Sequence, residues 1–240
     1  NKIISHDLNQ NPSDIYDTPN KDWQKHILHF GGGSNVTEQQ TFKNHLNSYK
    51  AIIQDSLFGG TVQSVFKESS NPLDPTILNG ITDRIEKGVS LMCYFGHSNS
   101  NTSGFEINLD EPQNWNNSGK YPLMLVNSCY NGNIFQLAPS KSEEFVQVAN
   151  FGAIGYIASV SLGFDTYLNE YSRNLYKLFS RSNYGYTIGE QMKANIDQLY
   201  YPSNSYMETT CMQMVLNGDP MVKLNWHQKP EIELLEQNVS

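Results

Sequence analysis

Two residues that can carry out covalent catalysis each follow an apolar run of the chain. His97 comes after the run 89–95, and Cys129 comes after the run 121–126. A cysteine thiolate attacks a carbonyl carbon, while a neighbouring imidazole stabilises the thiolate and then protonates the leaving amine. The pair therefore predicts acyl-transfer chemistry, with Cys129 as the nucleophile and His97 as its partner.

This chemistry also needs hydrogen-bond donors for the oxyanion that forms on the attacked carbonyl. We expect the backbone amides of Ser98 and Cys129 to supply them, because both lie in the loops that carry the reactive side chains. Gly96 and Gly132 in the same loops would let a peptide backbone approach closely. The two loops together thus contain the parts of a cysteine peptidase site.

The other cysteines and histidines lack this setting. Cys93 lies inside an apolar run and Cys211 lies in a segment without a nearby base, so both are predicted to pack in the interior. Three cysteines cannot form a full disulfide framework, and no C-x-x-C pair indicates zinc. The remaining histidines are interpreted as surface or packing residues: His6, His26, His29, His45 and His227.

Strands and helices are predicted to alternate along the chain. The predicted strands are 26–30, 61–66, 89–95, 122–127 and 152–158. Helices with one apolar face are predicted over 37–53, 75–87, 140–150, 165–180 and 188–200. This alternation indicates an α/β fold with a mainly parallel sheet covered by helices on both faces, in which loops leaving adjacent strands share a crevice.

Local signals set several of these boundaries. Capping boxes are predicted to start helices at Thr37, Ser140 and Thr187, and Gly88 is predicted to end one. The polar segment 98–120, which contains Trp115, is longer than ordinary connections and is interpreted as a functional loop.

Composition indicates one globular domain and excludes some classes of partner. We expect an irregular lead-in over 1–22, a catalytic domain over 23–228 and a linker over 229–240, each end adjoining a removed segment. A formal net charge of -8 argues against a nucleic-acid partner, and no apolar stretch is long enough for a transmembrane segment. A charged content of only 17% favours a secreted or surface protein.

Four segments give the sequence a resemblance to the gingipain family of cysteine peptidases. Within that family it is most similar to the PorU-type sortases of the type IX secretion system of Bacteroidetes. The segments are 23–33 with the helix after it, 88–97, 123–132 and 216–220. Their order and spacing extend the resemblance from about residue 23 to residue 224, and the stretch 142–161 follows the same course.

The resemblance implies a caspase-like three-layer sandwich, a Cys/His catalytic pair and activity at the cell surface or outside the cell. It assigns the catalytic roles to His97 and Cys129. It also implies that Ser159, Val160 and Ser161 shape the pocket for the side chain before the scissile bond.

Two positions depart from the family pattern. The chain has His97-Ser98 where His-Gly is common, which keeps the amide and adds a side chain. The acidic residue that orients the histidine is expected after the first strand, where this chain has Gly31-Gly32-Gly33. Orientation of His97 is then left to a backbone carbonyl, to Glu38 or to no strong partner. Glu38 could also favour basic substrates, but an ordinary first-turn role with the helix dipole is preferred.

The resemblance implies protein or peptide substrates exported by the secretion system, with other secretion components as further partners. Catalysis is expected to require no cofactor. Family members often bind calcium, and because no Asp-x-Asp-x-Asp loop is present, metal binding stays open.

The leading hypothesis is a cysteine endopeptidase or transpeptidase that removes a C-terminal sorting domain from exported proteins through a thioester acyl-enzyme. The alternative is a catalytically weak or inert module that recognises secreted cargo. A third hypothesis, phosphate binding at Gly31–Asn35, is disfavoured because neither established glycine-rich phosphate motif is present.

Overall fold

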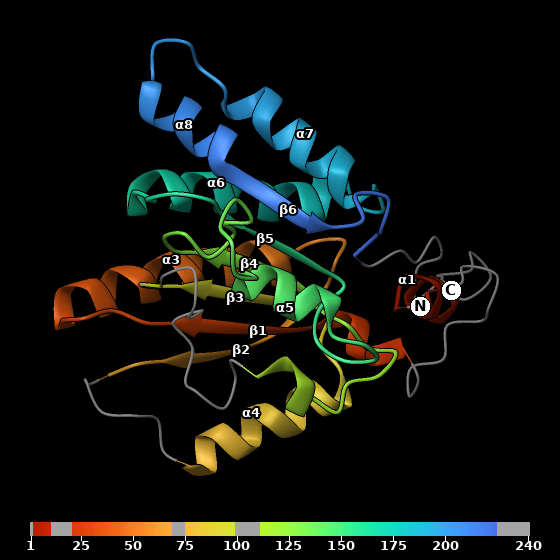
Figure 1. The fold of residues 1–240 in the computed structure, drawn as a ribbon. Coiled ribbons are helices and arrows are strands. Elements are labelled where there is room, and N and C mark those ends of the chain that lie inside the picture. Colours follow the sequence, from red (N-terminus) through yellow and green to blue (C-terminus); the bar gives the residue numbers. More distant parts are fainter. Residues whose placement is uncertain (1, 11–20, 69–74, 99–110, 225–240) are drawn as a thin grey trace, which may run out of the picture.

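The computed structural model describes residues 2–10, 21–68, 75–98 and 111–224, and its centre is a six-stranded sheet (Figure 1). The strands are β1 (His26–Gly31), β2 (Thr61–Phe66), β3 (Leu91–Phe95), β4 (Leu123–Asn127), β5 (Gly155–Ser159) and β6 (Met214–Gly218). Their order across the sheet is β2-β1-β3-β4-β5-β6. The first five strands run parallel, and β6 pairs with β5 in the antiparallel direction.

Helices cover both faces of the sheet and complete three layers (Figure 1). One face packs against α3 (Val36–Gln54), α6 (Asp165–Lys177), α7 (Ile188–Leu199) and α8 (Ser205–Gln213). The other face packs against α4 (Pro75–Lys87) and α5 (Lys141–Gln147). The predicted α/β fold with a mainly parallel sheet between two helical layers is confirmed.

Strand β3 shows why these segments are so apolar. Leu91, Cys93 and Phe95 belong to the core on one face. Met92 and Tyr94 belong to the core on the opposite face. Because successive side chains of a strand point to opposite faces, a strand buried on both sides reads as a continuous apolar run.

Helix starts follow their capping residues, with one correction. The capping boxes at Ser140 and Thr187 are both formed. The predicted start at Thr37 is wrong, because the side chain of Asn35 accepts a hydrogen bond from the Glu38 amide and caps α3 two residues earlier. Gly88 ends α4 with φ of 110°, a backbone conformation that favours glycine.

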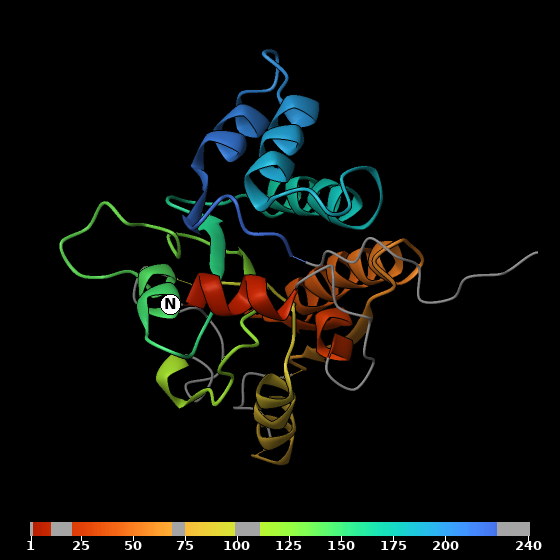
Figure 2. The same cartoon turned by 90° about the vertical axis from the view of Figure 1, so that its right-hand side faces the viewer.

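The first residues depart from the expected irregular lead-in. Helix α1 (Lys2–Asn9) lies across the end of the sheet at which the parallel strands begin (Figure 2). The His6 side chain is buried and its Nε2 lies 3.1 Å from the carbonyl oxygen of Lys223. Asn9 donates a hydrogen bond to the carbonyl of Gly119. The sequence did not predict helix α1, because its eight residues show little apolar periodicity. A short 3₁₀ helix, Asp22–Lys25, then leads into β1.

The last part of the fold contains two further corrections. Strand β6 and helix α8 were not among the predicted elements. Trp115, expected in a functional loop, is 2% exposed and packs edge-on against Phe145 with ring centroids 5.0 Å apart. It therefore serves the core. The predictions for 99–110, His227 and 229–240 lie outside the described residues.

Smaller helical turns complete the described chain. A 3₁₀ helix spans Pro112–Asn114, and a π-helix, Leu178–Ser182, continues α6. Among the described helices, none combines the length and the apolar character that crossing a bilayer requires.

Candidate catalytic site

The two predicted catalytic residues lie in loops that leave adjacent parallel strands at the same edge. His97 follows β3 and Cys129 follows β4, and the pairing of these strands ends with Phe95 opposite Asn127. The Gly96 amide then donates a hydrogen bond of 3.2 Å to the Asn127 carbonyl. Pairing thus continues into the loops and brings their first residues side by side at the carboxyl edge of the sheet.

Glu38 is the partner that orients His97. Its Oε2 lies 3.0 Å from Nε2 of the imidazole, and it also accepts a hydrogen bond of 2.8 Å from the Ser34 amide. The Ser34 amide, and then His97, lower the pKa of the Glu38 carboxyl. Among the alternatives left open by the sequence, the structure selects this one. Because Glu38 occupies Nε2, Nδ1 is the ring nitrogen that stays open to another partner.

Helix α3 explains how an acid five residues past the three glycines reaches the histidine. Strand β1 lies beside β3, so α3 begins next to the loop that carries His97. Phe42, one turn after Glu38, meets the His97 ring edge-on with centroids 5.9 Å apart. A carboxylate in the first helical turn also interacts favourably with the helix dipole. Glu38 can therefore favour the helix start and bind His97 at the same time.

Tyr94 supports His97 from inside the sheet. Its hydroxyl donates a hydrogen bond of 2.9 Å to the His97 carbonyl. A Cβ atom on Gly96 would overlap this hydroxyl, and one on Gly32 would lie only 2.8 Å from it. The two glycines are thus required by the close approach of the tyrosine.

The nucleophile loop is tied to its neighbours on both sides. The Ser98 hydroxyl donates a hydrogen bond of 2.8 Å to the Cys129 carbonyl, which links the two catalytic loops. On the other side, the amides of Tyr130 and Gly132 donate to the carbonyls of Ser161 and Ser159, both at 2.9 Å. The serine that replaces glycine after the histidine therefore has a bridging role.

Tight backbone geometry presents the cysteine at this turn. Tyr130 adopts φ of 58°, in the left-handed region that non-glycine residues rarely occupy. A Cβ atom on Gly132 would lie 2.6 Å from the Ala158 carbonyl oxygen, so the backbone of the loop lies directly against β5. Strain of this kind concentrates at functional sites.

Gly163 is a site residue that the sequence reasoning missed. Its amide donates to Sγ of Cys129 at 3.4 Å, and its carbonyl lies 3.9 Å from the same atom. These two contacts join the loop that follows β5 to the nucleophile. A glycine four residues after β5, in a loop already interpreted as part of the pocket, was the available signal.

The amides of Ser98 and Cys129 were predicted to bind the oxyanion. Within the described part of the chain, neither amide donates to a protein acceptor, whereas the Tyr130 amide is engaged by Ser161. Their role in binding an oxyanion stays a prediction.

The predicted pocket residues do not behave alike. Ser159 is fully buried, and its hydroxyl donates to the Ser161 carbonyl and accepts from the Ser161 amide. The Ser159 side chain thus closes a turn and does not face an open pocket. Val160 and Ser161 are partly exposed, and the Val160 amide donates to the Gln213 carbonyl at the end of α8.

The two other cysteines and His29 pack in the interior, in agreement with the structural roles predicted for them. Cys93 is fully buried, and burial raises the pKa of its thiol to about 12. Cys211 is 4% exposed, and burial raises the pKa of its thiol. His29 is fully buried with Nε2 2.8 Å from the Tyr176 hydroxyl, and burial lowers the pKa of His29 to about 3. These groups are unsuited to nucleophilic or acid–base work near neutral pH.

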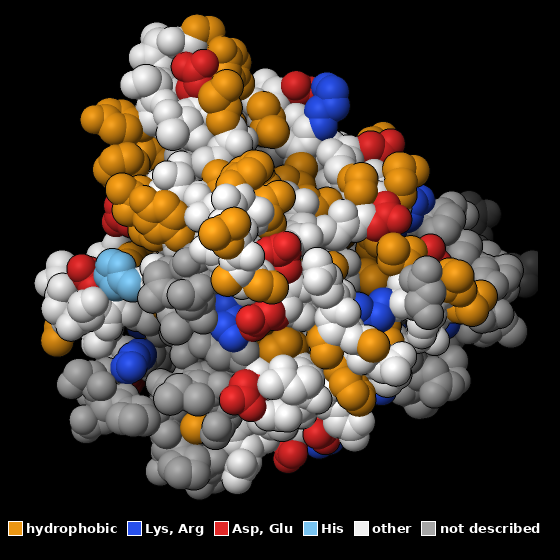
Figure 3. All heavy atoms as spheres, viewed as in Figure 1, with side chains coloured by type: hydrophobic (Ala, Val, Ile, Leu, Met, Phe, Trp, Pro, Cys, Tyr) orange, Lys and Arg blue, Asp and Glu red, His pale blue; other side chains and the backbone are white. Residues whose placement is uncertain are grey.

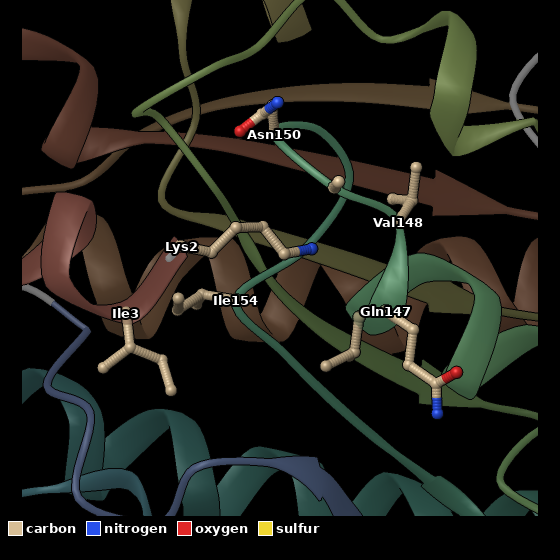
Figure 4. A pocket seen from close by; sticks show the side chains of 8 residues that line it. Lys2, Ile3, Gln147, Val148, Asn150 and Ile154 are labelled. Atoms are coloured by element: carbon tan, nitrogen blue, oxygen red, sulfur yellow. The ribbon is translucent and has the colours of Figure 1, made fainter.

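A cavity of about 260 Å³ lies at the opposite edge of the sheet (Figure 4). The Lys2 side chain points into it, and its ammonium donates to the carbonyls of Phe145, Phe151 and Ala153 at 2.8–3.3 Å. Burial lowers the pKa of Lys2 to about 8. All of these carbonyls precede β5, so the cavity lies at the edge where the parallel strands begin. His97 and Cys129 lie at the opposite edge, where the strands end.

No group of three or more His, Cys, Asp or Glu side chains that could hold a metal ion occurs within the four described ranges. Metal binding, which the sequence left open, stays open for the chain as a whole.

Comparison with known proteins identifies the family. The model of peptidase family C25 matches residues 1–225. The chain belongs to this family, the gingipain family of cysteine peptidases. The predicted family resemblance is confirmed, while its PorU-type detail stays a prediction.

Solved gingipain structures share the fold. The Arg-specific cysteine proteinase gingipain R superimposes with a TM-score of 0.64 and 16% identity, covering 92% of this chain and 52% of that chain. The complex of the pro- and mature domains of RgpB from Porphyromonas gingivalis gives a TM-score of 0.64 and 18% identity, covering 91% and 53%. This chain thus spans about half the length of the solved relatives. No match was found among curated protein sequences.

These gingipain structures confirm the caspase-like fold that the resemblance implied. At identities of 16–18% they show the architecture alone. The arrangement of Cys129, His97 and Glu38 therefore carries the functional argument for this member of the family.

Proposed function

We propose that the chain is the catalytic domain of a cysteine endopeptidase, with Cys129 as nucleophile and His97 as its acid–base partner. The observation that carries the proposal is the placement of both residues on adjacent loops of one sheet edge, with Glu38 bound to the imidazole. Membership of a cysteine peptidase family supports it.

The proposed reaction proceeds through an acyl-enzyme. Sγ of Cys129 forms a bond to the substrate carbonyl carbon, the amides of Ser98 and Cys129 bind the oxyanion, and the C–N bond then breaks. His97 transfers its proton to the departing amine, which leaves a thioester on Cys129. Attack by water completes hydrolysis, and attack by another amine completes transpeptidation. The thiolate, the imidazole and the amides supply every group required, so no cofactor is needed.

We propose exported proteins as substrates, with a C-terminal sorting domain as the part removed. The supporting observation is the resemblance to PorU-type sortases over residues 23–224. The proposed location is the cell surface, on the extracellular face of the outer membrane, where other components of a type IX secretion system would be partners.

Alkylation of Cys129 by iodoacetamide tests the catalytic pair without a known substrate. An unassisted thiol has a pKa near 8.5 and is almost wholly protonated at pH 6. If His97 stabilises the thiolate, Cys129 should label at pH 6 about 100-fold faster in wild type than in His97→Ala, as measured by peptide mass spectrometry. Cys93 and Cys211 are buried internal controls that should not label in the native protein.

The alternative, an inert module that recognises secreted cargo, was motivated by the missing acid after β1. Glu38 now fills that role, so the main reason for this alternative is gone. Labelling of Cys129 that is slow at pH 6 and insensitive to His97→Ala would restore it.

A further inference from the structure

An exposed apolar surface adjoins the nucleophile. Three side chains form what we call the apolar ledge: Leu162, Phe164 and Tyr206, which are 57%, 51% and 53% exposed. Phe164 and Tyr206 meet edge-on with ring centroids 5.2 Å apart. Figure 3 shows hydrophobic side chains gathered over α6 and α8, next to a histidine at the edge of the molecule where the strands end.

The backbone of the ledge touches the reacting atom. Gly163, which lies between Leu162 and Phe164, donates its amide to Sγ of Cys129 at 3.4 Å. In an acyl-enzyme, the Cα atom of the substrate residue that carries the attacked carbonyl is two bonds from this sulfur. The side chain of that residue must therefore lie beside the groups that surround Sγ, and the ledge residues flank one of them.

Helix α8 holds the ledge in a fixed position. The Gln213 side chain donates to the Leu162 carbonyl, and the Gln213 carbonyl accepts from the Val160 amide, both at 2.9 Å. The ring of Tyr206 stacks on Tyr167 at a centroid distance of 5.5 Å and an interplanar angle of 12°. Contiguous exposed apolar side chains are typical of binding surfaces.

Among the described residues, two carboxylates of the surrounding loops and helix starts, Glu38 and Asp165, accept hydrogen bonds from the protein. Glu38 binds His97 and the Ser34 amide. Asp165, which follows Phe164, accepts hydrogen bonds from the amide and hydroxyl of Thr166. A pocket that selects arginine or lysine directs a carboxylate at the cation, whereas the side chains of the ledge itself are apolar or aromatic and offer no charge. The ledge therefore favours an uncharged side chain.

We propose that the apolar ledge binds the substrate side chain on the acyl side of the scissile bond and selects a large apolar residue, phenylalanine or leucine, over a charged one. This rests on the proposed cysteine peptidase function. Hydrophobic pockets discriminate by burying area that a smaller or charged side chain leaves unfilled, which gives differences of about 10- to 200-fold.

Peptidyl acyloxymethyl ketones test this selection, because they place a chosen side chain beside the carbonyl that Cys129 attacks. The probes are acetyl-Ala-Ala-Xaa acyloxymethyl ketones with Phe, Leu, Arg or Glu as Xaa. The second-order rate constant for modifying Cys129 is divided by the iodoacetamide rate constant of the same variant. We expect the Phe and Leu probes to exceed the Arg and Glu probes at least about tenfold.

Variants assign the selection to the ledge. Phe164→Ala and, independently, Tyr206→Ala should each remove most of the preference for the Phe probe. Tyr186→Ala is the matched control, since Tyr186 is 52% exposed and lies in another loop. Asp165→Asn should leave the order of the four probes unchanged.

Two results would overturn the proposal while leaving the peptidase function in place. One is an Arg probe that reacts fastest and loses its advantage in Asp165→Asn. The other is four probes that react alike although iodoacetamide labelling depends on His97. If labelling itself shows no dependence on His97, the peptidase function fails and the selection proposed here fails with it.

Discussion

The two edges of the parallel sheet are built in opposite ways. At the amino edge, where the parallel strands begin, α1 crosses the sheet. The Lys2 ammonium of α1 donates hydrogen bonds to three backbone carbonyls beside a cavity. At the carboxyl edge, the His97 side chain is 58% exposed, and its ion pair with Glu38 is open to solvent. The ledge residues there are exposed as well.

This difference indicates that one edge of the sheet mainly stabilises the fold, while the other carries the side chains available for chemistry. At the amino edge, the Lys2 ammonium and Nε2 of His6 lie within hydrogen-bond distance of backbone carbonyls, and losing such a partner costs free energy of folding. At the carboxyl edge, the side chains left open are those that a substrate would contact. We therefore expect substitutions at the amino edge to change stability and those at the carboxyl edge to change the reactivity of Cys129.

The largest expected effect is on stability, at the amino edge. Lys2→Met removes the ammonium donor from the Phe151 and Ala153 carbonyls, while the Phe145 carbonyl keeps the Ala153 amide, and the change should lower the free energy of unfolding by about 1–3 kcal/mol. Urea denaturation at pH 7 measures this change. The matched control is Lys193→Met, because Lys193 forms an exposed ion pair with Asp197 whose loss should cost less than about 1 kcal/mol.

In the same Lys2→Met variant, iodoacetamide labelling of Cys129 in the folded protein should match wild type. A labelling rate that falls in step with stability would contradict the separation of the two edges.

A smaller effect is expected at the carboxyl edge. Glu38→Gln removes the charge that orients His97 and should slow labelling of Cys129 about three- to tenfold, with a change in stability below about 1 kcal/mol because the pair is exposed. Since the pKa of Glu38 is lowered in the folded protein, its carboxylate keeps its charge to lower pH than an ordinary glutamate does. The ratio between wild type and variant should thus be constant from pH 8 to about pH 5.

Glu144→Gln is the control for that comparison, because Glu144 forms an ion pair with Lys141 on α5, away from His97. Equal slowing in both variants would show that loss of negative charge, and not orientation of His97, causes the effect.

The sequence predicted the parts of the molecule that follow local rules. Strand β2 was predicted with its observed bounds, and Phe42, Leu46, Tyr49 and Ile53 of α3 are all buried because helical periodicity places them on one face. The positions of His97 and Cys129 followed from parallel strands whose loops meet at one edge.

Other features depend on contacts between distant segments and could not be read from local patterns. Helix α1 is held by carbonyls more than 140 residues away, and the Sγ contact of Gly163 joins two loops. Asn35 and not Thr37 caps α3, because the Asn35 side chain accepts the hydrogen bond from the Glu38 amide three residues later. Glu38 was one of three open choices until the position of β1 beside β3 was known.

The smallest expected effect tests the connection between the buried sheet and the exposed site. Tyr94 is 3% exposed, yet its hydroxyl donates to the carbonyl of His97. Tyr94→Phe removes only this hydroxyl and should cost about 1 kcal/mol of stability. Because the hydrogen bond holds the backbone of His97 and not its ring, labelling of Cys129 should slow only about two- to threefold.

Tyr200→Phe is the matched control, because its hydroxyl donates to Glu208 on an exposed surface and should affect neither quantity. A loss of stability in Tyr94→Phe with unchanged labelling would mean that Glu38 and Phe42 alone position the ring. A loss of labelling as large as that in Glu38→Gln would mean that the buried Tyr94 hydroxyl positions His97 as strongly as Glu38 does. A residue of β3 would then affect both the stability of the fold and the reactivity of Cys129, and the two properties would not be separated at the carboxyl edge.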